Sequence, residues 1–171
     1  MIGQLAYAAP QILSDMADMV MFGRAELRIL DLGCGTGLAG AVFKSRAARL
    51  DGIDLSPAMI EKARARGIYD SLRVGDIEAA FTGRYDLILA ADTLVYLGEL
   101  TALFDTVAAG LARDGYFLFT TEAKSGGGFE LGPKRRWRHS EAYIREQAAA
   151  AGLEVAGLVA ASPRAEANQP V

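Results

Sequence analysis

Apolar positions follow two different periods along this chain. Six short runs are rich in apolar residues, and several end at glycine or aspartate: 27–33, 48–55, 71–76, 85–92, 116–121 and 153–160. Runs of this length predict strands, and the nearly continuous runs at 27–33 and 85–92 are typical of strands buried on both faces. Three other segments show helical spacing or composition instead: 11–22, 38–47 and 100–111. The pair Asp114-Gly115 predicts a turn before the fifth strand.

Capping residues indicate two further helices. Ser56 precedes Pro57, which combines an N-cap hydroxyl with a proline suited to the first helical position, and Gly67 ends this predicted helix. Ser140 supplies the same kind of cap for a predicted last helix over 141–151.

The alternation of strands and helices predicts the fold class. Helical connections of about 10–15 residues imply right-handed crossovers and a mostly parallel sheet with helices on both faces. With 171 residues, 51% of them apolar, the chain suits one core, so we expect a single doubly wound, Rossmann-like α/β domain over 1–171. An N-terminal helical segment would occupy 1–26 and the core 27–160. Ligands of such sheets bind beyond the carboxyl ends of the strands.

Charge and cysteine content exclude several classes of function. The net charge of −3 gives no bias toward nucleic acids or anionic membranes. A single cysteine, Cys34, excludes an internal disulfide and suits a reducing compartment. The first twenty residues contain Asp15 and Asp18 and lack a basic start, so we expect no signal peptide, no membrane span and a cytoplasmic protein.

Glycines cluster directly after the first predicted strand. Gly33, Gly35 and Gly37 allow a sharp turn in which a ligand approaches bare main chain. Asp54 ends the second strand, where a carboxylate accepts hydrogen bonds from a ribose diol in this type of sheet. The combination predicts a cofactor that contains adenosine, and it leaves two classes open.

Asp31, just before the glycines, separates the two classes. The stretch "GTGLAG" at 35–40 matches the dinucleotide pattern G-x-G-x-x-G and would indicate an NAD(P)-dependent oxidoreductase. Asp31 would then place a negative charge beside a pyrophosphate, which is unfavourable. S-adenosylmethionine instead carries a sulfonium and an ammonium group, and Asp31 suits these cations.

The chain resembles a known family in several successive motifs: "DLGCGTG" (31–37), "GIDLSPAMIEKAR" (52–64), "VGDIE" (74–78), "YDLILAADTLVYLGEL" (85–100) and "LARDGYFLFTTE" (111–122). In this order they are similar to class I S-adenosylmethionine-dependent methyltransferases, over about 27–160. "LAYAAP", "VYLG" and "RHSEAYIR" further resemble the methyltransferase domain of bacterial proteins predicted to pair it with tetratricopeptide (TPR) repeats, although the sequence contains no such repeats.

The resemblance implies a cofactor site at the strand ends, formed by Asp31, Gly33, Cys34, Gly35, Asp54, Leu55, Met59, Asp76, Ile77 and Ala91. The residues from the first strand and its turn would surround the methionine part, and Asp54 would bind the ribose. Leu55, Met59 and Ile77 would contact the adenine ring, with Asp76 accepting from its amino group. Asp76 has a simpler alternative role, which is to close a turn.

Methyl transfer from a sulfonium mainly requires an aligned nucleophile in a water-poor site. We therefore expect neither a catalytic triad nor a metal, and the single histidine and cysteine do not suggest either. Asp92, Tyr96 and His139 are weak candidates for contact with the acceptor. The basic, glycine-rich segment 123–140 predicts a loop on the acceptor side.

Family members usually end in a sixth strand and an antiparallel seventh, and this chain stops where the seventh would begin. We therefore expect an open sheet edge at the sixth strand, which a second copy or a partner chain would cover. The sequence-based conclusion is a methyltransferase that acts on a small molecule and releases S-adenosylhomocysteine. A cofactor-binding module without catalysis and, less favoured, an NAD(P)-dependent oxidoreductase stay open as alternatives.

Overall fold

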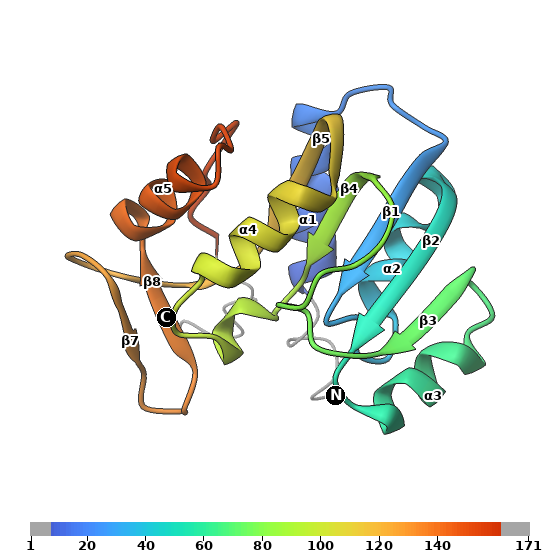
Figure 1. Ribbon diagram of the computed structural model, residues 1–171, viewed down its shortest axis with the longest axis horizontal. Helices are drawn as coiled ribbons and strands as arrows, with labels where there is room; N and C mark the ends of the chain where they lie inside the picture. The colour runs from blue at the N-terminus through green and yellow to red at the C-terminus, as the bar shows by residue number, and fades with distance from the viewer. Residues whose placement is uncertain (1–7, 162–171) are drawn as a thin grey trace, which may run out of the picture.

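The computed structural model describes residues 8–161 and contains a five-stranded parallel sheet (Figure 1). Its strands are β1 (Leu27–Leu32), β2 (Ala47–Asp54), β3 (Ser71–Val74), β4 (Tyr85–Ala90) and β5 (Leu111–Phe119). Their order is β3-β2-β1-β4-β5, and every neighbouring pair is parallel. The chain builds outward from β1 to β3 and then returns to the other side of β1. The order therefore reverses between β1 and β4, where ligands of doubly wound sheets bind.

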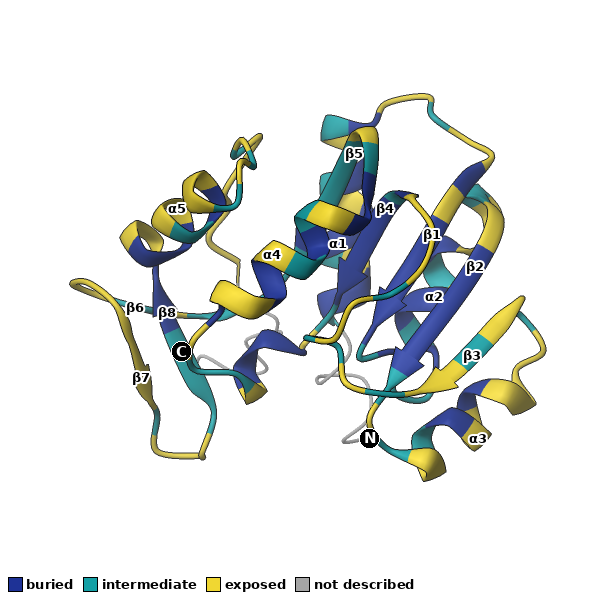
Figure 2. Cartoon of the chain, viewed as in Figure 1, coloured by how far each residue is buried: buried dark blue, intermediate teal, exposed yellow. Residues whose placement is uncertain are grey.

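Helices cover both faces of the sheet, as predicted. Because side chains alternate along a strand, β1 directs Leu27 and Ile29 to one face and Leu30 to the other. On the first face, α1 (Ala8–Val20) and α2 (Leu38–Phe43) pack against the sheet, while α4 (Thr101–Gly110) and α5 (Glu141–Ala150) pack on the second. The short cluster under α3 (Pro57–Ala65) contains Cys34 and Ile60. Figure 2 shows β1 and β4 as the most buried strands and β3 as largely exposed.

The predicted helix caps are confirmed. The Ser56 hydroxyl accepts a hydrogen bond from the Met59 amide at 3.3 Å, and Pro57 occupies the first position of α3. The Ser140 hydroxyl accepts from the Tyr143 amide at 3.1 Å at the start of α5. The predicted helix over 38–47 is shorter than expected, because a 3₁₀ turn, η1 (Lys44–Arg46), leads directly into β2.

Segment 123–140 was predicted as a loop, and this prediction is wrong. It forms most of a second, three-stranded sheet of β6 (Glu122–Lys124), β7 (Phe129–Leu131) and β8 (Trp137–Ser140), in the order β6-β8-β7. An aromatic cluster stabilises this small sheet. Phe129 lies 5.7 Å from the Trp137 ring and 5.1 Å from the ring of Tyr143 in α5, measured between centroids. The other side of the same strands carries charged residues.

The prediction of a sixth strand at 153–160 is also wrong. Within the described residues, no strand follows α5. Leu153 and Val155 pack against the α4–α5 face, while Leu158 and Val159 are exposed, so the apolar run is only partly buried. The edge of the sheet on this side is therefore β5. The predicted Asp114-Gly115 turn lies inside β5, where Asp114 has a positive φ of 61° and the pairing with β4 shifts register.

No helix between residues 8 and 161 is long and apolar enough to cross a membrane.

Candidate functional site

The glycine turn after β1 lies at the reversal point of the sheet and has the conformation predicted for it. Gly33, Gly35 and Gly37 all adopt positive φ, of 65°, 53° and 93°. A Cβ atom at Gly33 would lie 2.6 Å from the side chain of buried Thr93, so β4 and the turn approach closely there. A Cβ at Gly35 would meet nothing within 4 Å. The turn is thus packed on one side and open on the other.

The carboxylate of Asp54 joins the end of β2 to this turn. Its Oδ2 accepts a hydrogen bond from the Gly35 amide at 2.9 Å, and its Oδ1 accepts from the Ser56 amide at the same distance. The Cys34 amide donates to the Ile53 carbonyl at 3.0 Å, which ties the two segments further. Each carboxylate oxygen keeps a free acceptor position. Asp54 is therefore oriented in advance for a donor such as a ribose hydroxyl.

The residues expected around adenine lie at the carboxyl ends of β2 and β3. Leu55 is 72% exposed, which is unusual for a large apolar side chain beside a strand end, and Met59 is partly buried on α3. Asp76 is exposed, and its Oδ1 accepts from the Glu78 amide at 2.9 Å, so it closes a turn. Its Oδ2 still has no partner among the described hydrogen bonds. Ile77 packs against the core.

Asp31 lies beneath the glycine turn and is only 1% exposed. The Tyr69 hydroxyl donates to its Oδ2 at 2.7 Å, and the Gly40 amide in α2 donates to the same carboxylate. Burial raises the pKa of Asp31 to about 7, against the lowering effect of these two donors. Its charge therefore depends on pH in the neutral range. Tyr69 was missed by sequence reasoning, because it lies outside every motif and 38 residues from Asp31.

Cys34 is also buried, and burial together with the charges of Asp31 and Asp54 raises the pKa of its thiol. A thiol in this environment stays protonated and is a poor nucleophile. Its sulfur would lie 3.1 Å from a Cβ at Gly52, so Cys34 fills the space between the turn and β2.

The end of β4 carries Ala91, which was expected in the cofactor site, and it is followed by Asp92 and Tyr96, which were expected near the acceptor. Ala91 is partly buried, and Tyr96 is 67% exposed in the short 3₁₀ turn η2 (Leu94–Tyr96). Asp92 is exposed and has a positive φ of 51°, and its carboxylate forms an ion pair with Arg136. Arg136 also donates to Glu122 in β6. This ion pair holds the small sheet against the end of β4, and it occupies one of the two carboxylate oxygens of Asp92.

His139 lies inside the small sheet and does not face the surface. It is 2% exposed, and Nε2 lies 2.9 Å and 3.0 Å from the carbonyl oxygens of Leu97 and Gly98. Because carbonyls only accept, Nε2 carries the proton and Nδ1 accepts from the Thr121 hydroxyl. Burial lowers the pKa of His139, which favours this neutral form. Both ring nitrogens of His139 are therefore hydrogen-bonded within the fold.

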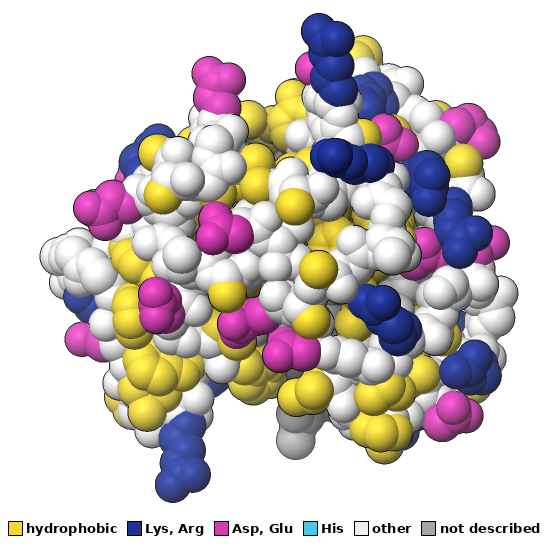
Figure 3. Space-filling view, in the orientation of Figure 1, with side chains coloured by type: hydrophobic (Ala, Val, Ile, Leu, Met, Phe, Trp, Pro, Cys, Tyr) yellow, Lys and Arg dark blue, Asp and Glu magenta, His cyan; other side chains and the backbone are white. Residues whose placement is uncertain are grey.

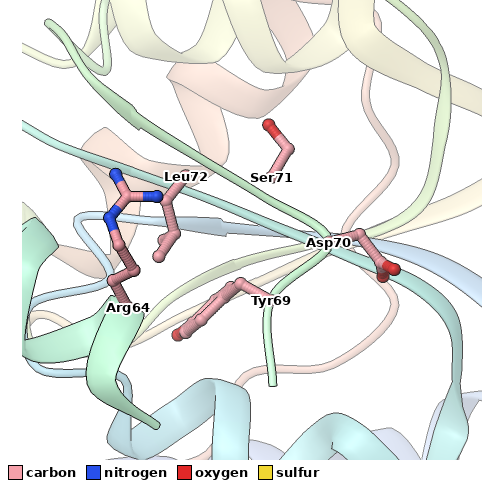
Figure 4. Close-up of a pocket in the computed structure, with 5 residues that line it drawn as sticks. All are labelled: Arg64, Tyr69, Asp70, Ser71 and Leu72. Atoms are coloured by element: carbon pink, nitrogen blue, oxygen red, sulfur yellow. The ribbon is translucent and has the colours of Figure 1, made fainter. Parts of the chain in front are cut away.

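A pocket of about 340 Å³ lies elsewhere, at the start of β3 (Figure 4). It is lined by Arg64, Tyr69, Asp70, Ser71 and Leu72. Of these residues only Tyr69 reaches toward the glycine turn, through its hydroxyl. The first residue of β3, Ser71, pairs with Asp51 in β2, so the pocket lies beside the middle of the sheet and not at the carboxyl ends of the strands.

The arrangement suits binding and alignment more than acid–base chemistry. Residues 8–161 contain no group of three or more His, Cys, Asp or Glu side chains placed to hold a metal ion. On the face shown in Figure 3, acidic and basic side chains are interspersed. The open turn, the oriented Asp54 carboxylate and the exposed Leu55 together fit an adenosine-containing ligand.

Comparison with known proteins agrees with this ligand class. A family profile described as a methyltransferase domain matches residues 1–157. A malonyl-[acyl-carrier protein] O-methyltransferase of Acetivibrio thermocellus is 34% identical over 114 residues, which is 64% of this chain and 40% of that protein. A ubiquinone biosynthesis O-methyltransferase of Xanthomonas oryzae is 29% identical over 114 residues, or 63% of this chain and 48% of that protein. The chain thus covers less than half the length of these relatives.

Solved structures share the fold. A magnesium protoporphyrin IX methyltransferase from Synechocystis, determined with bound S-adenosylmethionine, superposes with a TM-score of 0.69 at 22% identity, covering 88% of this chain and 71% of that one. The same enzyme with bound S-adenosylhomocysteine gives a TM-score of 0.72 at 21% identity, over 90% and 77% of the two chains.

Proposed function

Because the chain belongs to the methyltransferase domain family, we propose that it transfers the methyl group of S-adenosylmethionine to a small-molecule acceptor. One observation carries the proposal. The Asp54 carboxylate is held by the Gly35 and Ser56 amides at the open side of the glycine turn. An NAD(P)-dependent oxidoreductase is not supported, since the family match and the relatives named above are methyltransferases.

The contacts described above support the following proposed cofactor site. Asp54 accepts from the ribose hydroxyls, and the bare main chain of Gly33 to Gly35 lines the methionine part. Leu55 and Met59 contact one side of the adenine, with Ile77 opposite, while Asp76 accepts from the adenine amino group through the oxygen not used by Glu78. Burial of Leu55 by the ligand removes a large exposed apolar surface from water, which favours binding.

When bound, S-adenosylmethionine supplies a methyl group on a sulfonium, which is a good leaving group. The residues of the chain then have three tasks: to hold the methionine part, to align the acceptor and to exclude water. Asp31 and Asp54 place negative charge near the cationic part. Ala91 and Asp92, at the end of β4, would lie near the amino-acid part of the cofactor and the methyl group, where the acceptor has to approach. No proton transfer by a side chain is needed if the acceptor atom is already a nucleophile.

We place the acceptor between the end of β4 and the small sheet. Two relatives are named as O-methyltransferases, which favours an oxygen acceptor here as well. Since the Asp92 carboxylate is engaged by Arg136, an oxygen that ionises by itself near neutral pH fits this site better than an aliphatic alcohol. Tyr96, exposed on η2, is the aromatic residue that we expect to contact this acceptor.

Three further points belong to the same proposal. The subgroup paired with tetratricopeptide repeats stays a prediction, as does a cytoplasmic location. A second copy or a partner would pair with β5, which is now the edge strand, since the expected sixth strand is not formed.

Titration calorimetry with S-adenosylhomocysteine tests the proposal. We expect binding in the micromolar range by the wild type, no binding of NAD, and loss of at least tenfold in affinity for Asp54→Ala. Asp86→Ala is the matched control, because the Asp86 carboxylate also accepts a main-chain amide, that of Arg28 at 2.8 Å, at the amino ends of β1 and β4. Equal losses in both variants, or no binding by folded wild type, would contradict the proposed site. Retained binding without turnover on any acceptor oxygen would favour the non-catalytic alternative.

A further inference from the structure

Tyr69 occupies a slot formed by glycines from three different elements. A Cβ at Gly40 would lie 2.2 Å from the Tyr69 hydroxyl oxygen, and Cβ atoms at Gly37 and Gly52 would each lie 3.0 Å from ring carbons. Gly40 belongs to α2, Gly37 ends the glycine turn, and Gly52 lies in β2. Any side chain at these positions would therefore meet the ring. The glycines of this region make room for a tyrosine as well as for a ligand.

The Tyr69 side chain extends from the pocket at the start of β3 to the buried carboxylate of Asp31. Tyr69 precedes β3 and lines the pocket at its start, where its ring extends away from Asp70 (Figure 4). The hydroxyl donates to Asp31 Oδ2 at 2.7 Å beneath the glycine turn. Asp31 is 1% exposed, so no water-exposed donor replaces this contact. A buried carboxylate that loses a donor loses much of the stabilisation of its charged form.

We propose that Tyr69 is a positioning residue of the cofactor site, which acts through Asp31 and sets the negative charge available to the sulfonium. This inference rests on the proposed function, because it takes the methionine part of the cofactor to lie above Asp31. Tyr69 itself does not touch the cofactor. In the low-dielectric interior, a carboxylate acts on a nearby cation without direct contact.

Ionisable groups from the glycine turn, from the end of β2 and from the segment after α3 surround Asp31 and Tyr69. Asp54, at the end of β2, raises the pKa of Asp31, while Tyr69 and the Gly40 amide lower it. The Cys34 thiol in the turn stays protonated, and Arg66 after α3 lies close enough to act on Tyr69 and donates to the Thr36 carbonyl at 2.6 Å. Tyr69 is the one side-chain donor to Asp31 within the described residues.

The two forms of the cofactor provide a direct readout. S-adenosylmethionine carries a sulfonium charge that S-adenosylhomocysteine lacks, and the rest of the two molecules is alike. The ratio of their dissociation constants therefore reports the charge on Asp31. In the wild type, preference for S-adenosylmethionine should rise with pH through about 7, as Asp31 loses its proton. In Asp31→Asn this rise should be absent.

Tyr69→Phe removes the hydroxyl and keeps the ring in its slot. Without this donor the midpoint of the rise should move upward by about one pH unit. At pH 7.5, binding of S-adenosylmethionine should then weaken by about threefold, because a pKa shift of one unit lowers the ionised fraction of Asp31 by about that factor. Binding of S-adenosylhomocysteine should change less than twofold.

Tyr85→Phe is the matched control. The Tyr85 hydroxyl donates to the buried carboxylate of Asp51 at 2.8 Å on the other face of the sheet, so this variant also loses a tyrosine–aspartate hydrogen bond. It should leave both the ratio and its midpoint unchanged. A ratio in Tyr69→Phe that matches the wild type at every pH, or a shift of the same size in Tyr85→Phe, would overturn the proposal.

A second substitution covers the case in which Tyr69→Phe does not fold. Site-specific 3-fluorotyrosine at position 69 keeps the hydroxyl and makes it a better donor, so the midpoint should move to lower pH. An unchanged midpoint in this variant would overturn the proposal. If the wild type binds neither cofactor form, the proposed function fails and this inference with it. If the wild type binds both cofactor forms and substitution of Tyr69 does not move the pH midpoint of their affinity ratio, this inference alone fails.

Discussion

Alanine at Gly33 should mainly lower the stability of the fold, whereas alanine at Gly35 should mainly weaken cofactor binding. Both glycines have positive φ, which costs alanine about 1–2 kcal/mol. At Gly33 the new Cβ would also lie 2.6 Å from Thr93. Thr93 cannot rotate away freely, because its hydroxyl donates to the carbonyls of Leu32 and Ala91 at 3.3 Å and 3.0 Å.

Overpacking of this kind adds about 1–3 kcal/mol, so Gly33→Ala should lower the free energy of unfolding by about 2–5 kcal/mol in total. Gly35→Ala should lower it by about 1–2 kcal/mol only, since its Cβ meets nothing within 4 Å. That methyl group instead enters the open side of the turn. Gly35→Ala should therefore weaken the binding of S-adenosylhomocysteine by more than tenfold.

Urea denaturation at neutral pH measures the first effect and calorimetric titration the second. The two variants should differ by about 1–3 kcal/mol in stability, which corresponds to about 2–4 °C in melting temperature for each kcal/mol in a domain of this size. Equal stability of the two variants would show that Thr93 does not pack against the turn as described. Normal binding by Gly35→Ala would place the cofactor elsewhere.

Three other substitutions test further parts of the structure. Burial raises the pKa of Asp31 from 3.8 to about 7, so its contribution to stability is present below about pH 3.8 and is lost as pH rises to about 7. In urea denaturation the wild type should therefore lose stability relative to Asp31→Asn as pH rises from about 4 to about 7, and a constant difference would contradict the shifted pKa. Ser140→Ala removes the cap of α5 and should cost about 1 kcal/mol in the same assay, whereas no change would mean that the cap is replaced by water. Gly110→Ala places a Cβ 2.1 Å from the Phe81 ring and should lower the melting temperature by several degrees, unless the ring moves out to solvent.

The sequence predicted those parts of the structure that depend on neighbouring residues. Ser56 with Pro57 forms a helix start from its own local geometry, and the glycines after β1 need positive φ whatever surrounds them. The small sheet could not be predicted in this way. Its strands are three or four residues long, and their glycine-rich and basic connections hide the alternation that β7 and β8 share.

Long-range contacts account for the remaining differences. Tyr69 reaches Asp31 only because the fold brings residues 38 positions apart together, and no spacing rule predicts such a contact. His139 was a weak candidate for contact with the acceptor, but pairing with β7 turns it into the interior. The apolar run at 153–160 has the composition of a strand and finds no strand beside it among residues 8–161. Composition alone does not supply a pairing partner.

The small sheet is attached to the rest of the domain through a few defined contacts. Arg136 bridges Asp92 and Glu122, and the Trp137 ring lies against Gly98, where a Cβ would be 3.0 Å from it. The glycine turn and Asp54 take no part in these contacts. Substitutions on the charged side of the small sheet therefore leave the turn intact. Under the proposed function, the choice of acceptor can therefore diverge between descendants of this protein while the methyl-donor site is inherited unchanged.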